Sequence, residues 1–385
     1  MAGYIFSLDS ISSLALYTNS GVYATKLSAP SGIWMVHHEG TFADYATMQA
    51  GDNVYFFIQR KIYGIGKLIN IEGDCKFFNF PNAGTPSIFD YAKVKNELLW
   101  DEGEVSVRQR CVCFFEPDPY FFQLGIDMDD VLASNPVAFK MLRAFWKLSF
   151  IKFDDEENQA FRNIILKRNQ SVLVNPLSNT NTFSFHPQHA RIAQLLRTGN
   201  YKLSTGLMTM LSSCAIYNAL NHEMAIEAGI LHQLANKDQA TGHIFGQWDY
   251  LSHQVIASPF KPIDYMDKMD MFGYSYIPGF RPTRAQFLVG EIKKNAAKLE
   301  DIDQLLKYVD WVRDEYSFGD YSTICAFLVA YEFSDNVIQH KKRVGIRKYT
   351  SGFRPAQSLE WNNVKLVKYT FDATIKKLNF TFIGE

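Results

Sequence analysis

The chain contains 385 residues, of which 47% are hydrophobic and 21% charged, and this ordinary globular composition supports two domains, or three. The net charge of −1 excludes a uniformly basic protein, so any surface that binds nucleic acid must be local. Five cysteines without metal-knuckle spacing predict reduced thiols and a cytoplasmic protein, and we expect neither a secretion signal nor a membrane-spanning segment.

The first part of the chain predicts a β-rich domain. Apolar residues at 56–58 and 62–69 flank the polar corner 59–61, a pattern that is typical of a β-hairpin. The segment "GIWMVHHEG", residues 32–40, predicts another strand, and clusters of Gly and Asn separate these elements.

Helical patterns follow this β-rich part. They begin near 131–147, and the segment 154–169 starts with acids and ends with bases, an order that suits the helix dipole. The stretch "NPLSNTNTFSFHPQ" is rich in Asn, Ser, Thr and Pro, which predicts a linker. We therefore expect a β-rich domain with terminal helices at 1–165, a helical connector and linker at 166–204, and a second domain at 205–385.

The second domain predicts a mixed α/β sheet with the element order αβββαβ. A strand, a crossover helix and a further strand indicate parallel pairing of the two strands. The predicted helical region, the three strands, the helix, the fourth strand and two short closing strands are 205–236, 248–256, 268–276, 286–292, 300–317, 322–332, 363–370 and 377–383.

The third of these strands ends in an acid and a base, in the stretch "QFLVGEIKKNA". Side chains alternate along a strand, so Glu291 and Lys293 share one face, while Leu288 and Ile292 take the other. Lys and Glu are rarely buried unless they are paired, so an acid and a base at the end of a core strand indicate a site. The alternative is a solvated strand end, since Glu-x-Lys also occurs by chance.

A carboxylate also falls on the apolar face of the helix "LNHEMAIEAGILHQLA". Helical spacing places Glu227 at the centre of the apolar stripe and Glu223 at its edge. A carboxylate in such a stripe is costly unless it is paired or bound to metal. A salt bridge from Glu227 to an Arg or Lys is the alternative.

Asp270 begins an aromatic strand that precedes the strand of Glu291. Their separation is the one expected for neighbouring strands of a long hairpin, which would place Asp270 near Glu291. Asp267 and Asp264 are alternatives to Asp270 for the same position.

The helix "LEDIDQLLKYVDWVRDEY" carries two further candidates. Gln304 and Tyr308 lie four residues apart, with Trp311 next on the same side, away from the apolar stripe of the helix. An exposed helix face with ordinary polar residues is the alternative.

The order of a helical Glu, an Asp, Glu-x-Lys and Gln-x-x-x-Tyr resembles the PD-(D/E)XK nuclease superfamily, in particular its RecB-type, NucS-type and Shedu-type branch. The resemblance covers 215–332, under a third of the chain, and no Pro precedes the Asp as it does in the full motif. It implies metal binding by Asp270 and Glu291, a lysine beside the nucleophilic water in Lys293, a first-helix acid in Glu227 or Glu223, and a helix motif in Gln304 and Tyr308.

These residue types suit a phosphodiester hydrolase independently of the resemblance. Carboxylate oxygens are the hard ligands that Mg²⁺ prefers, and one or two carboxylates typically hold it. The bound metal lowers the pKa of its water and clamps phosphate oxygens, while a lysine on the same strand face offsets developing charge. We expect Mg²⁺ as the cofactor, with Mn²⁺ able to substitute.

A local basic stretch, "HKKRVGIRKY", predicts contact with phosphates, because such clusters often bind nucleic-acid backbones. A solvated face is the alternative. The cations of the stretch are Lys341, Lys342, Arg343, Arg347 and Lys348.

The segment "MQAGDNVYFFIQRKIYGIGKLINI" resembles the PUA-like β-barrels of the EVE and ASCH types. The resemblance implies a small barrel that binds nucleic acid, in which Trp34 and Tyr55 would line an aromatic pocket and stack on a base. Aromatic residues of a protein core are the alternative.

From these features we expect a Mg²⁺-dependent endonuclease that cuts double-stranded DNA in antiviral defence, with the first domain recognising DNA. A repair nuclease for branched or mismatched DNA and a non-cleaving nucleic-acid-binding scaffold are the alternatives. Cutting both strands needs two active sites, so we also expect a homo-oligomer, a dimer or a tetramer.

Overall fold

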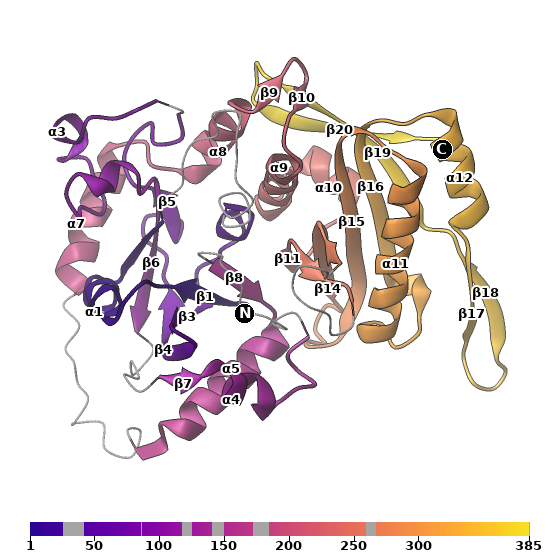
Figure 1. The fold of residues 1–385 in the computed structure, drawn as a ribbon, viewed down its shortest axis with the longest axis horizontal. Helices are drawn as coiled ribbons and strands as arrows, with labels where there is room; N and C mark the ends of the chain where they lie inside the picture. The colour runs from indigo at the N-terminus through magenta and orange to yellow at the C-terminus, as the bar shows by residue number, and fades with distance from the viewer. Residues whose placement is uncertain are drawn as a thin grey trace. The chain divides into compact units, whose positions relative to one another are not determined.

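The computed structural model contains two compact units, Met1–Ser213 and Cys214–Glu385 (Figure 1). Each unit has a mixed β-sheet with helices, which agrees with a mixed α/β chain whose first part is β-rich. No described helix is both long and apolar enough to cross a bilayer. The residues that the structure describes are 1–25, 42–85, 87–117, 125–140, 150–171, 185–258 and 267–384.

Two sequence predictions lie outside these described residues. One is the strand at 32–40, which includes Trp34 as a candidate pocket wall. The other is Asp264, the most distant alternative to Asp270.

The sheet of the first unit has the strand order β2-β6-β4-β3-β1-β8, with β5 beside β6 and β7 beside β4. Among its described strands β1 and β3 pair in parallel, and the other pairs are antiparallel. The strands are β1 (Gly3–Ser7), β2 (Val22–Thr25), β3 (Asn53–Ile58), β4 (Lys61–Leu68), β5 (Lys76–Phe78), β6 (Cys111–Pro117), β7 (Ile126–Asp127) and β8 (Phe150–Phe153).

The predicted hairpin at 56–69 is confirmed as β3 and β4. Its two corner residues, Gln59 and Arg60, have φ angles of 45° and 71°. Two positive φ angles at the central positions are what a type I′ turn requires, and this turn matches the twist of the flanking strands.

Aromatic side chains fill the core between this sheet and the helix α5 (Asp155–Arg168). Phe161 on α5 stacks on Phe153 with ring centroids 4.8 Å apart, and its ring centroid lies 5.0 Å from that of Tyr55. Asp154 caps α5, and acids open the helix while bases close it, as the sequence predicted.

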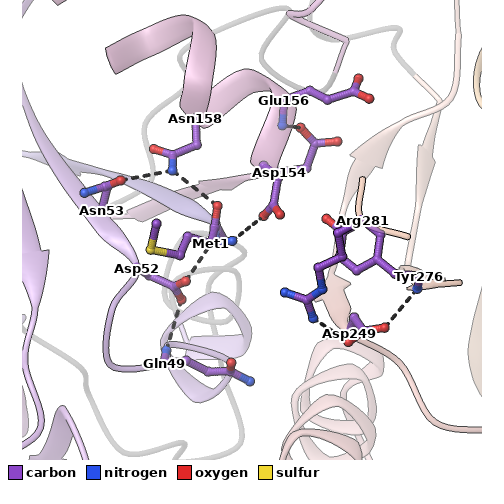
Figure 2. Close-up of polar contacts among 12 residues, drawn as sticks. Met1, Gln49, Asp52, Asn53, Asp154, Glu156, Asn158, Asp249, Tyr276 and Arg281 are labelled. Carbon is purple, nitrogen blue, oxygen red and sulfur yellow. Dashed lines mark hydrogen bonds and ion pairs between the residues drawn. The ribbon is translucent and has the colours of Figure 1, made fainter. Parts of the chain in front are cut away.

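A buried polar cluster ties the start of the first unit to this core (Figure 2). Asp52 accepts hydrogen bonds from the backbone N–H groups of Ala2 and Gln49, at 2.9 and 3.1 Å. The side-chain amide of Asn158 donates to Oδ1 of Asn53 at 3.0 Å, which joins α5 to β3. These contacts satisfy polar groups that would be costly to bury alone.

Helices occupy much of the region that we predicted as a linker. Helix α7 (Phe185–Thr198) lies inside 166–204, and α8 (Leu203–Ser212) follows it within the first compact unit. The assignment of 1–165 to a PUA-like domain stays a prediction. The other helices of this unit are α1 (Ile11–Ser20), α3 (Tyr91–Val94), the 3₁₀ helix Val105–Val107 and α4 (Met128–Ser134).

The sheet of the second unit has the order β11-β14-β15-β16-β19-β20. Strands β15 and β16 are parallel and α11 (Leu299–Glu315) connects them, which confirms the crossover that the sequence predicted. Strands β16 and β19 are also parallel. The strands are β11 (Tyr250–Ser252), β14 (Met271–Tyr276), β15 (Arg284–Ala296), β16 (Ile324–Glu332), β19 (Val364–Asp372) and β20 (Lys377–Ile383).

The region 205–236 is not continuously helical as predicted. The short hairpin of β9 (Ala215–Ile216) and β10 (Ala219–Leu220) separates α8 from α9 (Glu223–Ala235), and Tyr217 turns the chain with a φ of 55°. The remaining elements of the second unit are α10 (Gln239–Phe245), β12 (Val255–Ile256), β13 (Lys268–Met269), the 3₁₀ helix Tyr321–Thr323, α12 (Asp335–Val344), β17 (Arg347–Ser351) and β18 (Gln357–Trp361).

Strands β14 and β15 form an antiparallel hairpin within the second sheet. Both α9 and α11 pack against β15, and residues 287–292 of that strand are buried. Asp249 holds the closed end of the hairpin, since it accepts hydrogen bonds from Arg281 at 2.8 Å and from the backbone N–H of Tyr276 at 2.9 Å (Figure 2).

Candidate active site

Asp270 and Glu291 come together because β14 and β15 are neighbouring antiparallel strands. Met271 pairs with Gly290, so Asp270, the residue before β14, lies beside Glu291. Oδ2 of Asp270 accepts a hydrogen bond from the backbone N–H of Ile292 at 2.7 Å. The long-hairpin relation that the sequence predicted is therefore confirmed.

Glu291 and Lys293 share one face of β15 and form an ion pair. Nζ of Lys293 lies 2.6 Å from Oε1 of Glu291, and the two side chains are 24% and 1% exposed. Oε2 of Glu291 is also buried, and no amide, ammonium or alcohol group in the described part of the chain donates to it. The burial of Glu291 excludes a solvated strand end, and its free oxygen is available to a cation or a shared proton.

Glu227 reaches the same place from α9 and is 1% exposed. Its partners are His253, whose Nδ1 lies 3.3 Å from Oε2, and Gln254, whose Nε2 donates to both carboxylate oxygens at 3.2 and 3.4 Å. No Arg or Lys pairs with Glu227 among the described residues, so the salt-bridge alternative is not seen there.

Gln254 also donates to Oδ1 of Asp270 at 3.0 Å, so one amide group bridges two acids. Sequence reasoning missed this residue and its neighbour His253. Gln254 sits in a turn with a φ of 51°, a left-handed conformation that is uncommon for a side chain of this kind. A lone Gln between two short strands carries no sequence signal that would have identified it.

Two of the alternatives that the sequence left open, Glu223 and Asp267, lie in the described part of the chain. Glu223 is half-buried and accepts a hydrogen bond from the backbone N–H of Lys294 at 3.3 Å. Asp267 is exposed, and its backbone carbonyl accepts a hydrogen bond from Ala257. The geometry therefore favours Glu227 as the helical acid and Asp270 as its partner on the hairpin.

The helix α11 brings Gln304 and Tyr308 to the same site. Nε2 of Gln304 donates to the hydroxyl of Tyr308 at 2.5 Å, and Tyr308 is 1% exposed. The pKa of Tyr308 is raised by burial and then by the nearby charge of Glu291, with smaller effects of Asp270 and Asp267. Tyr308 thus lies buried near the acids, while Gln304 beside it is half-buried.

The pKa values of Asp270 and Glu291 are raised above their ordinary values. Burial raises the pKa of Glu291 to about 7, although the ammonium of Lys293 opposes this shift. Burial and the charges of Glu227 and Glu291 raise the pKa of Asp270 well above its ordinary value. Like charges in a low-dielectric site repel each other, so a shared proton or a bound cation would stabilise Asp270 and Glu291 together.

Lys293 stays charged. Burial alone would lower its pKa, but the carboxylates of Glu291, Asp270 and Glu223 raise it to about 12. Its ammonium also lies 3.9 Å from Asp301, which caps the start of α11 by accepting a hydrogen bond from the backbone of Lys298.

The donor set suits a hard divalent cation held by few protein ligands. Within the described residues, no three His, Cys, Asp or Glu side chains are already arranged as a metal cage. Asp270 and Glu291 are nevertheless adjacent, and Mg²⁺ is typically held by one or two carboxylates while it keeps several waters. Oε2 of Glu291 is a buried acceptor without an N–H or hydroxyl donor, and the two carboxyls repel each other; both features fit such an ion.

The cations of the basic stretch lie on α12 and on the hairpin of β17 and β18. Three of them form the last turn of α12, where cations suit the helix dipole. Lys348 is exposed and lies 3.3 Å from Glu360 on the neighbouring strand. The three α12 cations are Lys341, Lys342 and Arg343.

Two of the predicted nucleic-acid-binding residues have partners within the protein. Arg347 donates two hydrogen bonds to the carboxylate of Asp310 on α11, at 2.9 and 3.1 Å, and its contact with phosphate stays a prediction. Tyr55 is fully buried in the core of the first unit and donates to Oδ1 of Asn158 at 2.7 Å, so it cannot line an open pocket. Tyr55 belongs to a packed interior, whereas Arg347 is partly exposed beside Asp310.

Comparison with solved structures gives partial similarity to two of them. A crystal structure of a repair endonuclease from Pyrococcus abyssi matches with 20% identity and a TM-score of 0.21, over 31% of this chain and 43% of that one. A structure of an EndoMS complex with double-stranded DNA matches with 22% identity and a TM-score of 0.16, over 22% and 30%. No protein-family model and no curated protein sequence matches. The chain thus spans less than half the length of either structure, and we base the proposed function on the geometry of the site.

Proposed function

We propose that the second unit is a metal-dependent nuclease that hydrolyses phosphodiester bonds in DNA. The observation that carries this proposal is the convergence of Glu227, Asp270, Glu291 and Lys293 from one helix and two strands. Burying several acids together is expensive, so a purely structural role does not account for them.

Asp270 and Glu291 would hold Mg²⁺, or Mn²⁺ in its place, with Glu227 beside them. The ion would relieve the repulsion between the carboxyls and occupy the oxygen of Glu291 that lacks a donor. When bound, it lowers the pKa of a water molecule and stabilises charge on phosphate oxygens.

Lys293 is the residue that acts on the reacting water. Because its pKa is raised to about 12, the ammonium can donate a hydrogen bond to the water but cannot remove a proton from it. Its charge offsets the negative charge that develops on the phosphate as the water attacks and the phosphorus–oxygen bond breaks. Glu291 fixes the ammonium in position at 2.6 Å.

Gln304 and Tyr308 would position the phosphate or the water. Tyr308 stays protonated at neutral pH, and its hydroxyl oxygen already accepts from Gln304. Its proton is therefore available for donation toward the acids or toward a phosphate oxygen.

The first unit would recognise DNA as a PUA-like module. Its β-rich sheet and the segment 48–71 support this role, although Tyr55 does not supply a pocket wall. Because double-strand cleavage needs two sites, the working enzyme would be a symmetric homo-oligomer. Antiviral defence is the setting that we favour, and repair of branched or mismatched DNA is the alternative.

A substrate panel tests the function. Purified protein with Mg²⁺ is incubated with linear, circular, single-stranded, branched and mismatched DNA and with RNA, beside Glu291→Gln purified in parallel. Cleavage of ordinary duplexes supports a defence-type endonuclease, and cleavage confined to branched or mismatched DNA supports a repair nuclease. Binding without cleavage by the unaltered protein overturns the nuclease proposal in favour of a non-cleaving scaffold.

The unfolding stability of the metal-free protein should fall as pH rises. The pKa of Glu291 is raised from 4.5 to about 7, and that of Asp270 is also raised, so the folded state keeps protons that the unfolded chain has already released. This contribution to stability is fully present below about pH 4.5 and is lost as pH rises through about 7.

Mg²⁺ should reverse that loss at about pH 8, where the carboxyls are free of protons, and should do little at about pH 5. We expect a rise in melting temperature of roughly 2–8 °C at the higher pH, measured by thermal unfolding with MgCl₂ against NaCl of equal ionic strength. Glu291→Gln should lose most of this response. An equal response in that variant would mean that Mg²⁺ binds elsewhere.

Gln254→Ala should lower the cleavage rate about 10-fold and raise the Mg²⁺ concentration needed for half-maximal rate. Its amide bridges Glu227 and Asp270, so the alanine leaves both acids without the donor that fixes their orientation. Gln233→Ala is the matched control, because Gln233 is also a buried amide but bonds to Thr241 and Leu378. If Gln254→Ala changes neither the cleavage rate nor the Mg²⁺ concentration needed for half-maximal rate, Gln254 is not a positioning residue.

A further inference from the structure

The hairpin of β17 and β18 stands apart from the main sheet of the second unit, and most of its residues are exposed or half-buried. Its two strands form a sheet of their own, and in the described part of the chain no other strand pairs with either edge. Figure 1 shows the hairpin extending away from β16 and α11. An isolated two-stranded hairpin gains little stability in water, so a partner that covers it would add to its order.

The base of this hairpin is firmly attached to the unit. Arg347 at its start is bound by Asp310 of α11 through two hydrogen bonds. Trp361 at its end is buried, and its indole N–H donates to the backbone carbonyl of Ile324 at 3.0 Å. The ring of Tyr321 packs against the same end, with its centroid 5.9 Å from that of Trp361. The hairpin thus projects from a fixed base.

The tip of the hairpin presents an aromatic ring and a cation. Phe353 is 84% exposed, and the guanidinium of Arg354 lies 5.3 Å from the centroid of its ring. The turn is made possible by Gly352, whose φ is 76°. Phe353 therefore does not contribute to the core of its own unit, and an exposed apolar ring on a projecting turn indicates contact with a partner.

The positive charge around the hairpin favours a negatively charged partner. Residues 335–363 contain six lysines and arginines against two acids, in a chain whose net charge is −1, and one of the six, Arg347, is bound by Asp310 from outside this range. A second copy of the chain, meeting the same surface across a two-fold axis, would bring these cations against one another. A nucleic-acid backbone would instead place phosphates against them, and flat aromatic and guanidinium groups can also contact bases.

We propose that the hairpin is an arm that grips double-stranded DNA outside the reacting site, with Phe353 against base edges in a groove and Lys348 and Arg354 against phosphates. This inference rests on the proposed function, since the DNA held by the arm is the substrate of the acids on β14 and β15. The basic last turn of α12 continues the phosphate-binding surface from the base of the arm.

The test measures DNA binding by the full chain carrying Glu291→Gln, which keeps the duplex intact. A labelled duplex is titrated by fluorescence anisotropy in EDTA, with and without a second substitution. Phe353→Ala should weaken binding about 5-fold or more. Lys348→Ala and Arg354→Ala should each reduce the slope of affinity against salt by about 1. Phe318→Ala is the matched control, because Phe318 is also highly exposed, at 93%, but lies on the loop before β16 and not on the hairpin. This variant should bind DNA as tightly as its parent.

Each outcome of this test decides the inference separately from the nuclease proposal. If Phe353→Ala and Phe318→Ala both bind DNA as tightly as their parent, the proposal of a DNA-binding arm is overturned, even if the unaltered protein cleaves DNA. Loss of DNA binding by Phe353→Ala supports the arm, even if the unaltered protein cleaves nothing. If Phe353→Ala instead converts a dimer to a monomer in sedimentation with unchanged affinity for DNA, the hairpin is a contact between copies, and the arm is overturned.

Discussion

Glu291→Gln should lower the rate of DNA cleavage by about 1000-fold or more, because it removes one of the two carboxylates that would hold the proposed metal. Gln has the same shape but lacks the negative charge that a divalent cation requires. The measurement is single-turnover cleavage of duplex DNA at saturating protein, with Mg²⁺ raised until the rate no longer increases. A variant that reaches the unaltered rate at high Mg²⁺ would show that Glu291 only tunes affinity.

The same substitution should leave the fold intact. Glu291 is 1% exposed, and its pKa is raised to about 7, so the ionised side chain opposes folding at neutral pH. We expect a melting temperature of Glu291→Gln in metal-free buffer that equals or exceeds that of the unaltered chain at about pH 8. A large fall in melting temperature would make the loss of cleavage uninformative, and Asp270→Asn would then replace it.

Lys293→Met should lower the cleavage rate by about 100- to 1000-fold without weakening Mg²⁺ binding. Met keeps the length and apolar stem of the side chain but lacks the ammonium that offsets developing charge. Because the ammonium competes with a cation for Glu291, its removal should leave Mg²⁺ affinity equal or tighter. A loss of Mg²⁺ affinity together with rate would indicate that Lys293 merely supports the fold of the site.

Lys76→Met is the matched control for that experiment. Lys76 also stands two residues after an acid, pairs with Asp74 at 3.0 Å and has a side chain 12% exposed, but it lies in the first unit. This variant should cleave DNA at the unaltered rate. Equal losses in Lys76→Met and Lys293→Met would point to a general effect of removing a paired lysine.

The central elements of the second unit could be predicted because their signals are local. The strand of Glu291, the helix of Gln304 and the parallel strand that follows each show a clear apolar period, and the structure places all three as expected. The hairpin of β9 and β10 was missed because its turn depends on a positive φ at Tyr217, which side-chain chemistry does not encode.

The site could be predicted only in part, and for a physical reason. Glu227, Glu291 and Lys293 stand out because charged residues interrupt apolar faces, and the structure brings them together. His253 and Gln254 escape notice because they lie in a turn, where no periodicity marks an inward direction. The contact of Arg347 with Asp310 was not predicted, because Asp310 is distant in sequence and only the packing of α11 brings it near.

Metal-dependent cleavage tests the central claim most directly. Circular duplex DNA is incubated with the unaltered chain and with Asp270→Asn, purified in parallel, in Mg²⁺ and in Mg²⁺ with excess EDTA. The acid cluster predicts cleavage by the unaltered chain in Mg²⁺ alone, none in EDTA and none by a folded Asp270→Asn. Cleavage that survives EDTA, or that Asp270→Asn retains in full, would contradict a metal-dependent nuclease site at Asp270 and Glu291.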